Sequence, residues 1–90
     1  MLEGKIKVCN ALGLHARAAA QLVNLAGGFK SKIKLRRTDN HGIADAKSIL
    51  SVLTLAASKG VELKIEVEGK DESEAMQAIE EIFRNGFGET

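Results

Sequence analysis

The segment from Val61 to Glu68 alternates apolar and charged residues without interruption, and it constrains the fold more than any other part of the chain. Successive side chains of a β-strand point to opposite faces, so this pattern predicts a strand with one dry and one wet face. Lys5–Val8 and Lys32–Arg36 alternate in the same way, and a shorter run follows at Gly42–Ala44. The turn-forming residues Asp39–Gly42 predict a hairpin between the last two. We therefore expect a sheet that is covered on one side only.

Three further segments have helical patterns. Ala16–Ala26 is rich in alanine and leucine and ends at a glycine pair, which is typical of a helix and its stop. The stretch from Lys47 to Ala57 is apolar on most sides and predicts a helix partly buried beneath its neighbours. The last helix is expected to begin at Asp71, as a cap that forms a capping-box-like start with Glu74, and to end at Arg84–Gly86. The predicted order is β-α-β-β-α-β-α.

Charges on the wet faces predict the order of the strands. The strands at 5–8 and 32–36 present lysine and arginine on this face, whereas the strand at 61–68 presents Glu62, Glu66 and Glu68. Unlike charges placed opposite each other stabilise a sheet by about 0.2–1 kcal/mol, and like charges destabilise it. We therefore expect the acidic strand to lie between the two basic ones. All three helices are expected on the dry side, which gives an α+β fold, a two-layer open-faced sandwich.

Length and composition limit the classes of function. Ninety residues, 44% hydrophobic and 28% charged, predict one globular domain over residues 1–90. A formal net charge of +1 and the absence of Tyr and Trp argue against a nucleic-acid-binding protein, whose exposed sheet would carry stacking aromatics. No apolar run is long enough to span a membrane.

The cysteine content and the N-terminus indicate where the chain works. The single Cys9 cannot form an internal disulfide, and no histidine or cysteine cluster predicts a metal or cofactor site. We expect Cys9 to pack as a small hydrophobe or to lie at the end of the first strand. The N-terminal residues do not resemble a signal peptide, so we expect a cytoplasmic protein.

The chemistry is most readable in Gly13–Ala20, where His15 stands at the start of the first helix. The first N–H groups of a helix have no internal partner and favour an anion such as phosphate, so the backbone at Ala16, Arg17 and Ala18 is a candidate phosphate-binding site. A neutral imidazole offers a lone pair that can attack phosphorus. The guanidinium of Arg17 could bind the phosphoryl oxygens. These residues leave open the alternative that His15 is only solvated or only caps the helix.

Three segments resemble one known family. Gly13–Ala20 is similar to the active-site signature of HPr, the histidine-containing phosphocarrier family of the bacterial phosphotransferase system. Ala46–Val52 resembles that family's second helix, and Gly69–Glu72 with the alanine-rich helix after it resembles the third. The resemblance runs over nearly the whole domain. It implies the β-α-β-β-α-β-α sandwich with an antiparallel sheet in the order 1-4-2-3.

The resemblance also implies a function. His15 would accept a phosphoryl group on Nδ1 from enzyme I and donate it to a IIA protein, with Arg17 as the electrostatic partner, and the protein would act as a monomer. Leu50 and Leu53 would be candidates for the docking face, although they could equally lie in the core. One departure is that the family usually has proline where this chain has Ala18. Proline is tolerated in a first helical turn, so alanine leaves the motif intact.

Two questions of regulation stay open. Ser48 matches a position that an HPr kinase/phosphorylase modifies in part of the family, and the alternative is that it caps the second helix in competition with Asp45. His41, in a polar turn, is expected to be only solvated. Ile82–Phe87 and the Leu35–Arg37 region resemble the nitrogen-related branch of the family, called NPr, whereas Ala46–Ile49 looks more like the sugar branch. A regulatory homologue that acts mainly by phosphorylation-dependent protein binding is therefore the alternative function.

Overall fold

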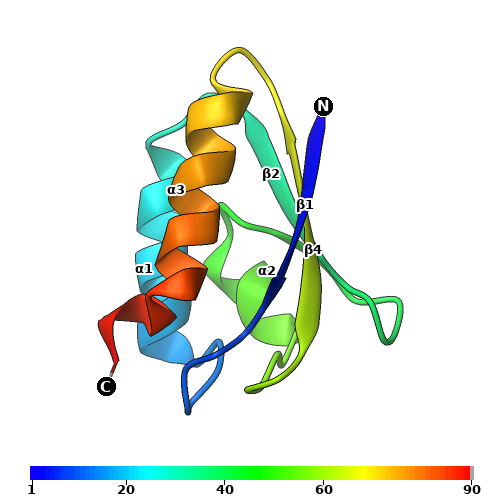
Figure 1. The fold of residues 1–90 in the computed structure, drawn as a ribbon, viewed down its shortest axis with the longest axis vertical. Helices are drawn as coiled ribbons and strands as arrows, with labels where there is room; N and C mark the ends of the chain where they lie inside the picture. The colour runs from blue at the N-terminus through cyan, green and yellow to red at the C-terminus, as the bar shows by residue number, and fades with distance from the viewer. Residues whose placement is uncertain (90) are drawn as a thin grey trace.

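The alternating segments form a single antiparallel sheet, with helices on one of its faces (Figure 1). The structure is a computed structural model that describes residues 1–89. Its elements, in chain order, are β1 (Leu2–Lys7), α1 (Ala16–Gly27), β2 (Lys32–Arg37), β3 (Ile43–Asp45), α2 (Ile49–Thr54), β4 (Glu62–Glu68), α3 (Glu72–Arg84) and the 3₁₀ helix η1 (Gly86–Gly88). The predicted element order is confirmed, and η1 is an addition that the sequence pattern did not predict.

The strand order is β1-β4-β2-β3, so the acidic strand β4 lies between the two basic strands as the charges predicted. In the antiparallel register, Glu62 lies opposite Lys7 of β1, and Glu66 lies opposite Lys34 of β2. Two pairings bring like charges together: Glu66 also lies opposite Glu3 of β1, and Lys64 lies opposite basic residues on both neighbouring strands. Lys64 forms a diagonal ion pair with Glu3, at 3.3 Å. Diagonal neighbours are within reach of a long side chain, which relieves the like-charge contact.

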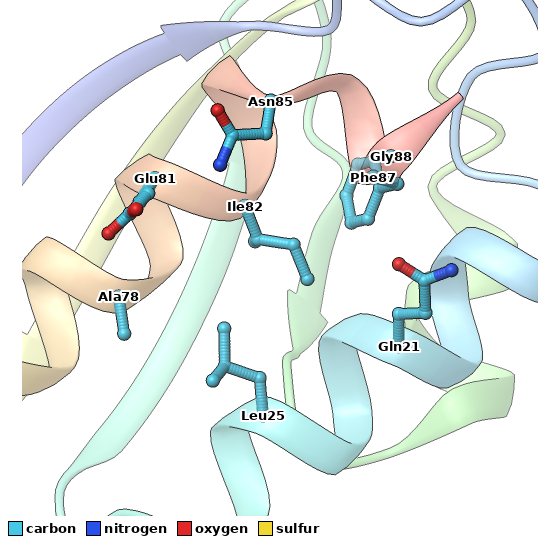
Figure 2. Close-up of a pocket in the computed structure, with 8 residues that line it drawn as sticks. All are labelled: Gln21, Leu25, Ala78, Glu81, Ile82, Asn85, Phe87 and Gly88. Atoms are coloured by element: carbon cyan, nitrogen blue, oxygen red, sulfur yellow. The ribbon is translucent and has the colours of Figure 1, made fainter. Parts of the chain in front are cut away.

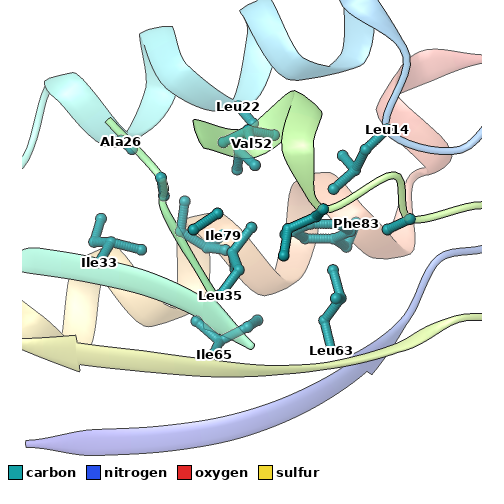
Figure 3. Packing of buried hydrophobic residues seen from close by; sticks show 14 of the residues in the cluster. Leu14, Leu22, Ala26, Ile33, Leu35, Val52, Leu63, Ile65, Ile79 and Phe83 are labelled. Carbon is teal, nitrogen blue, oxygen red and sulfur yellow. The ribbon is translucent and has the colours of Figure 1, made fainter. Parts of the chain in front are cut away.

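The core fills the space between the sheet and the helices, as Figure 3 shows. Inward-facing residues of β2 and β4 meet one side of each helix, and the fully buried side chains among them include Ile33, Leu35, Leu63, Ile65, Leu22, Val52, Ile79 and Phe83. Burying one such aliphatic or aromatic side chain contributes about 1.5–3 kcal/mol. This packing fixes α1 across the sheet and thereby fixes the position of its N-terminus.

The second helix departs from the sequence prediction. The expected helix over Lys47–Ala57 is shorter at both ends, and Val52 is its one buried residue. A six-residue helix makes fewer than two turns and covers the core with only one side. The chain leaves the helix through Ala56, whose φ of +49° ends the helical path.

The start of α3 also differs from the prediction. Asp71 occupies the N-cap position, but its side chain makes no cap hydrogen bond, so the expected capping box with Glu74 is wrong. The Asp71 carboxylate instead accepts hydrogen bonds from the Ser31 hydroxyl (2.5 Å), the Ser31 N–H (2.9 Å) and the Lys30 N–H (2.8 Å). These hydrogen bonds lower the pKa of Asp71 to about 2, and the bond from the Ser31 hydroxyl has the largest effect. The carboxylate therefore ties α3 to the start of β2, a longer-range contact than a cap.

Candidate functional site

The loop before His15 is held against the loop that follows α2. Gly13 has a left-handed φ of +67°, and a Cβ atom added there would lie 2.5 Å from the carbonyl oxygen of Ala57. The next residue, Leu14, is buried, and its N–H donates to the same carbonyl at 2.9 Å. Glycine suits this position because the left-handed backbone and the close approach to the Ala57 carbonyl both disfavour a side chain. This contact determines where the chain enters α1.

His15 is the N-cap of α1, as the sequence predicted for the helix start. Its carbonyl oxygen accepts the first helical hydrogen bond, from the Ala19 N–H at 2.8 Å. Its ring nitrogen Nδ1 accepts a hydrogen bond from the Arg17 N–H at 3.3 Å. The side chain keeps 26% of its surface exposed. The capping role that the sequence left open for His15 is thus present, and it directs Nδ1 toward the free N–H groups of the helix.

The three residues after His15 differ in exposure. Ala16 and Arg17 are exposed, whereas Ala18 is fully buried against the core. The helical ladder begins only at Ala19, so the N–H groups of these three residues lie in the first turn, where no helical carbonyl reaches them. The candidate phosphate-binding backbone is therefore at a true helix N-terminus, with the Arg17 guanidinium in solvent beside it.

Two residues that the sequence did not single out belong to the same site. Nε2 of His15 is hydrogen-bonded to Oε2 of Glu89, and Oε1 of Glu89 accepts from Nδ2 of Asn10 at 3.2 Å. Asn10 is buried and also donates to the Gly13 carbonyl at 2.8 Å. The His15 hydrogen bond, followed by that of Asn10, lowers the pKa of Glu89. Asn10 could have been suspected from its place in a turn, but nothing in the local sequence pointed to Glu89.

Several large apolar side chains on α2 and in the loop before His15 are exposed. On α2, Leu50 is 73% exposed and Leu53 is 36% exposed, so neither is a core residue. Ile49 on the same helix and Leu12, three residues before His15, are exposed as well. Helix α2 packs against α1. Exposed apolar side chains indicate a protein-binding surface when they form a continuous patch, so these four residues are candidates for one.

The other candidate residues have simple structural roles. Ser48 is the N-cap of α2, and its hydroxyl accepts from the Ser51 N–H at 3.3 Å. Asp45 does not take that role, because its carboxylate accepts from the Lys47 N–H. His41 is exposed in the β2–β3 turn. Cys9 lies beyond the end of β1, is exposed rather than packed, and donates its thiol hydrogen to the Phe83 carbonyl at 3.2 Å.

The candidate site is an open surface rather than a cavity. A groove of about 430 Å³ lies between α1 and α3, and Figure 2 shows Leu25 and Ile82 facing each other across it. His15 and Arg17 do not line this groove. Over residues 1–89, no three or more His, Cys, Asp or Glu side chains gather closely enough to hold a metal ion. In the same range, no helix has the length and apolar character needed to cross a membrane.

Comparisons with known proteins agree with this architecture. Residues 2–85 match the family model described as the PTS HPr component phosphorylation site. The chain is 46% identical to the phosphocarrier protein HPr of Cupriavidus necator, over 99% of this chain and 98% of that protein. It is 45% identical to HPr of Xylella fastidiosa, with the same coverage. The crystal structure of HPr-C-His from Thermoanaerobacter tengcongensis superposes with a TM-score of 0.92 at 38% identity, covering 100% of this chain and 99% of that one. The chain therefore belongs to the HPr family, the phosphocarrier proteins of the phosphotransferase system.

Proposed function

We propose that this chain accepts a phosphoryl group on Nδ1 of His15 from enzyme I and donates it to a IIA protein. The observation that supports this most directly is the hydrogen bond from the Arg17 N–H to Nδ1, which sets that nitrogen at the N-terminus of α1. An anion at this end is favoured by unpaired N–H groups and by the helix dipole. The protein carries the group and does not itself turn over a substrate.

The transfer needs only groups that the site already holds. The Arg17 N–H releases the Nδ1 lone pair, which forms a bond to phosphorus, while the bond from phosphorus to the donor breaks and its electron pair stays with the donor. The N–H groups of Ala16, Arg17 and Ala18 then face the new phosphoryl oxygens, and the exposed Arg17 guanidinium can bind them with two parallel hydrogen bonds. Because His15 and Arg17 are accessible, the group is held moderately and remains free to move to the next protein.

The docking surface is proposed to be the exposed apolar face formed by Leu12, Ile49, Leu50 and Leu53. Both enzyme I and the IIA protein must bring a reacting group to the same exposed His15, so one surface serves both partners in turn. We also propose that the protein works in the cytoplasm as a monomer, since this site is complete within one chain.

Ser48 is proposed as a secondary, regulatory site for a kinase such as HPr kinase/phosphorylase. Its hydroxyl is half-buried at the start of α2, beside the apolar face. A phosphate there would oppose the docking of acidic partners. Such control would suit either the sugar branch or the nitrogen-related branch of the system.

The proposed function is tested by incubating the chain with enzyme I and labelled phosphoenolpyruvate. We expect one phosphoryl group per chain, acid-labile and alkali-stable as a phosphoramidate is. A His15→Ala variant should take up no label, whereas a His41→Ala variant, which alters the chain's other histidine, should label normally. Undiminished labelling of His15→Ala would refute the assignment.

A further inference from the structure

The last described residues of the chain fold back onto the helix start that carries His15. After α3 ends at Arg84, the 3₁₀ helix η1 buries Phe87, whose ring packs edge-on against that of Phe83 at a centroid distance of 5.0 Å. Phe87 has a φ of +57°, a left-handed conformation that is unfavourable for an aromatic residue. Burial of the ring maintains this conformation, and the resulting turn directs Glu89 toward His15.

Glu89 is held there by two separate groups. Oε2 is bonded to Nε2 of His15, and Oε1 accepts from Nδ2 of the buried Asn10. The same Asn10 amide also donates to the Gly13 carbonyl, so it links Glu89 to the loop before α1. The Glu89 side chain is only 15% exposed. A carboxylate with this many fixed partners is part of the site.

The two hydrogen bonds of the His15 ring determine where its proton lies. A backbone N–H only donates, so Nδ1, which faces the Arg17 N–H, must offer its lone pair. An ionised carboxylate only accepts, so Nε2, which faces Glu89, must carry the hydrogen. The lowered pKa of Glu89 agrees with an ionised carboxylate. Both contacts therefore select the neutral tautomer with hydrogen on Nε2.

We propose that Glu89 is a positioning residue of the phosphoryl-transfer site, which keeps Nδ1 of His15 unprotonated, so that its lone pair can leave the Arg17 N–H and attack phosphorus. This inference rests on the proposed function. When Nδ1 bonds to phosphorus, the hydrogen on Nε2 stays in place and the ring becomes positively charged. Glu89 balances that charge, much as a buried carboxylate supports a catalytic imidazole. When the group moves on, the ring leaves as neutral imidazole without having to capture a proton.

The titratable groups that act on Glu89 are the imidazole of His15 and the guanidinium of Arg17, both at the start of α1. Arg17 adds a second positive charge near the carboxylate, so removing the carboxylate alters the charge balance around the phosphoryl group. In the phosphorylated ring, the Glu89 carboxylate favours retention of the hydrogen on Nε2. Without Glu89 that hydrogen should be lost at lower pH, so the rate of onward transfer should begin to fall at lower pH than in the parent. Loss of a hydrogen bond to a charged group should slow phosphoryl transfer by about tenfold or more.

The test uses three variants of the whole chain, Glu89→Ala, Glu89→Gln and the charge-matched control Glu81→Ala, whose side chain is exposed on α3. Nitrogen-15 spectra of the His15 ring, recorded without any enzyme, should show the Nε2–H tautomer in the parent and in Glu81→Ala. Glu89→Ala should instead show an average of both tautomers. Glu89→Gln removes the charge, and its single amide oxygen can accept from Nε2 of His15 or from Nδ2 of Asn10 but not from both, so this variant should show a weaker preference for the parent tautomer.

Transfer kinetics complete the test. Phosphorylation by enzyme I should slow about tenfold in Glu89→Ala. Glu89→Gln, which also lacks the carboxylate charge, should show the same shift of the pH profile. A parent-like ring spectrum together with a parent-like rate in Glu89→Ala would overturn the role of Glu89. If the parent itself took up no label, the proposed function would fail and the transfer role with it, but the ring spectra would still decide whether Glu89 selects the tautomer.

Discussion

Replacing Gly13 with alanine tests how firmly the loop before His15 is held. A Cβ atom at Gly13 would lie 2.5 Å from the Ala57 carbonyl oxygen and 2.8 Å from Cα of Ser58. Both are backbone atoms, so neither can rotate aside as the end of a side chain would. The left-handed φ costs about 1–2 kcal/mol for a residue with a side chain, and overpacking costs about 1–3 kcal/mol more. Gly13→Ala should therefore lower the free energy of unfolding by about 2–5 kcal/mol.

The matched control is Gly60→Ala. Gly60 also has a positive φ, of +93°, but nothing lies within 4 Å of a Cβ atom added there. This variant meets only the conformational cost, about 1–2 kcal/mol. Urea denaturation followed by circular dichroism compares the two, and a midpoint shift at constant slope reports stability alone. If Gly13→Ala were no less stable than Gly60→Ala, the close approach to Ala57 would not be a real constraint.

The same substitution has a functional consequence. The added methyl group would push apart the Leu14 N–H and the Ala57 carbonyl, whose 2.9 Å hydrogen bond fixes the entry into α1. His15 is the next residue, so its ring should move relative to the Arg17 N–H. At a temperature where the variant is fully folded, Gly13→Ala should accept phosphoryl groups more slowly than Gly60→Ala does. Equal rates would show that this loop does not position His15.

Three further predictions follow from other contacts. Ala18→Pro should change the free energy of unfolding by less than about 1 kcal/mol, because the ladder of α1 begins at Ala19 and the family usually has proline at this buried position. Its phosphohistidine should hydrolyse somewhat faster, since proline lacks the N–H that alanine offers to the phosphoryl group; denaturation and hydrolysis half-lives check both. Asp71→Asn should lower stability above pH 4, and the difference from the parent should shrink as the pH falls toward 2, because the pKa of Asp71 is lowered from 3.8 to about 2 in the folded chain; melting curves across that range check it. Ser48→Asp should alter stability by less than about 1 kcal/mol yet slow transfer to His15 at low salt, and an unchanged rate would remove Ser48 from the docking face.

Much of the fold could be predicted because the decisive signals are local or pairwise. Alternation along Val61–Glu68 determines a strand and its faces without reference to the rest of the chain. The charges on those faces then indicated which strands are neighbours, and the register opposes Glu66 to Lys34 as expected. Lys64 did not disturb the outcome, because its long side chain reaches Glu3 diagonally. The end of α2 could not be predicted, since Ala56 adopts a positive φ in a sequence where nothing local requires it.

The same distinction divides the candidate site. The placement of His15 and Arg17 at a helix N-terminus follows from a glycine turn and a run of helix-forming residues, all within one short segment. Glu89 joins His15 across 74 positions of sequence separation, and no periodicity or cap signal spans such a distance. Glu89 reaches His15 because the buried ring of Phe87 maintains a left-handed turn two residues earlier. That turn is stable only once α3 and the core are in place, so the partner of the histidine is a property of the tertiary fold.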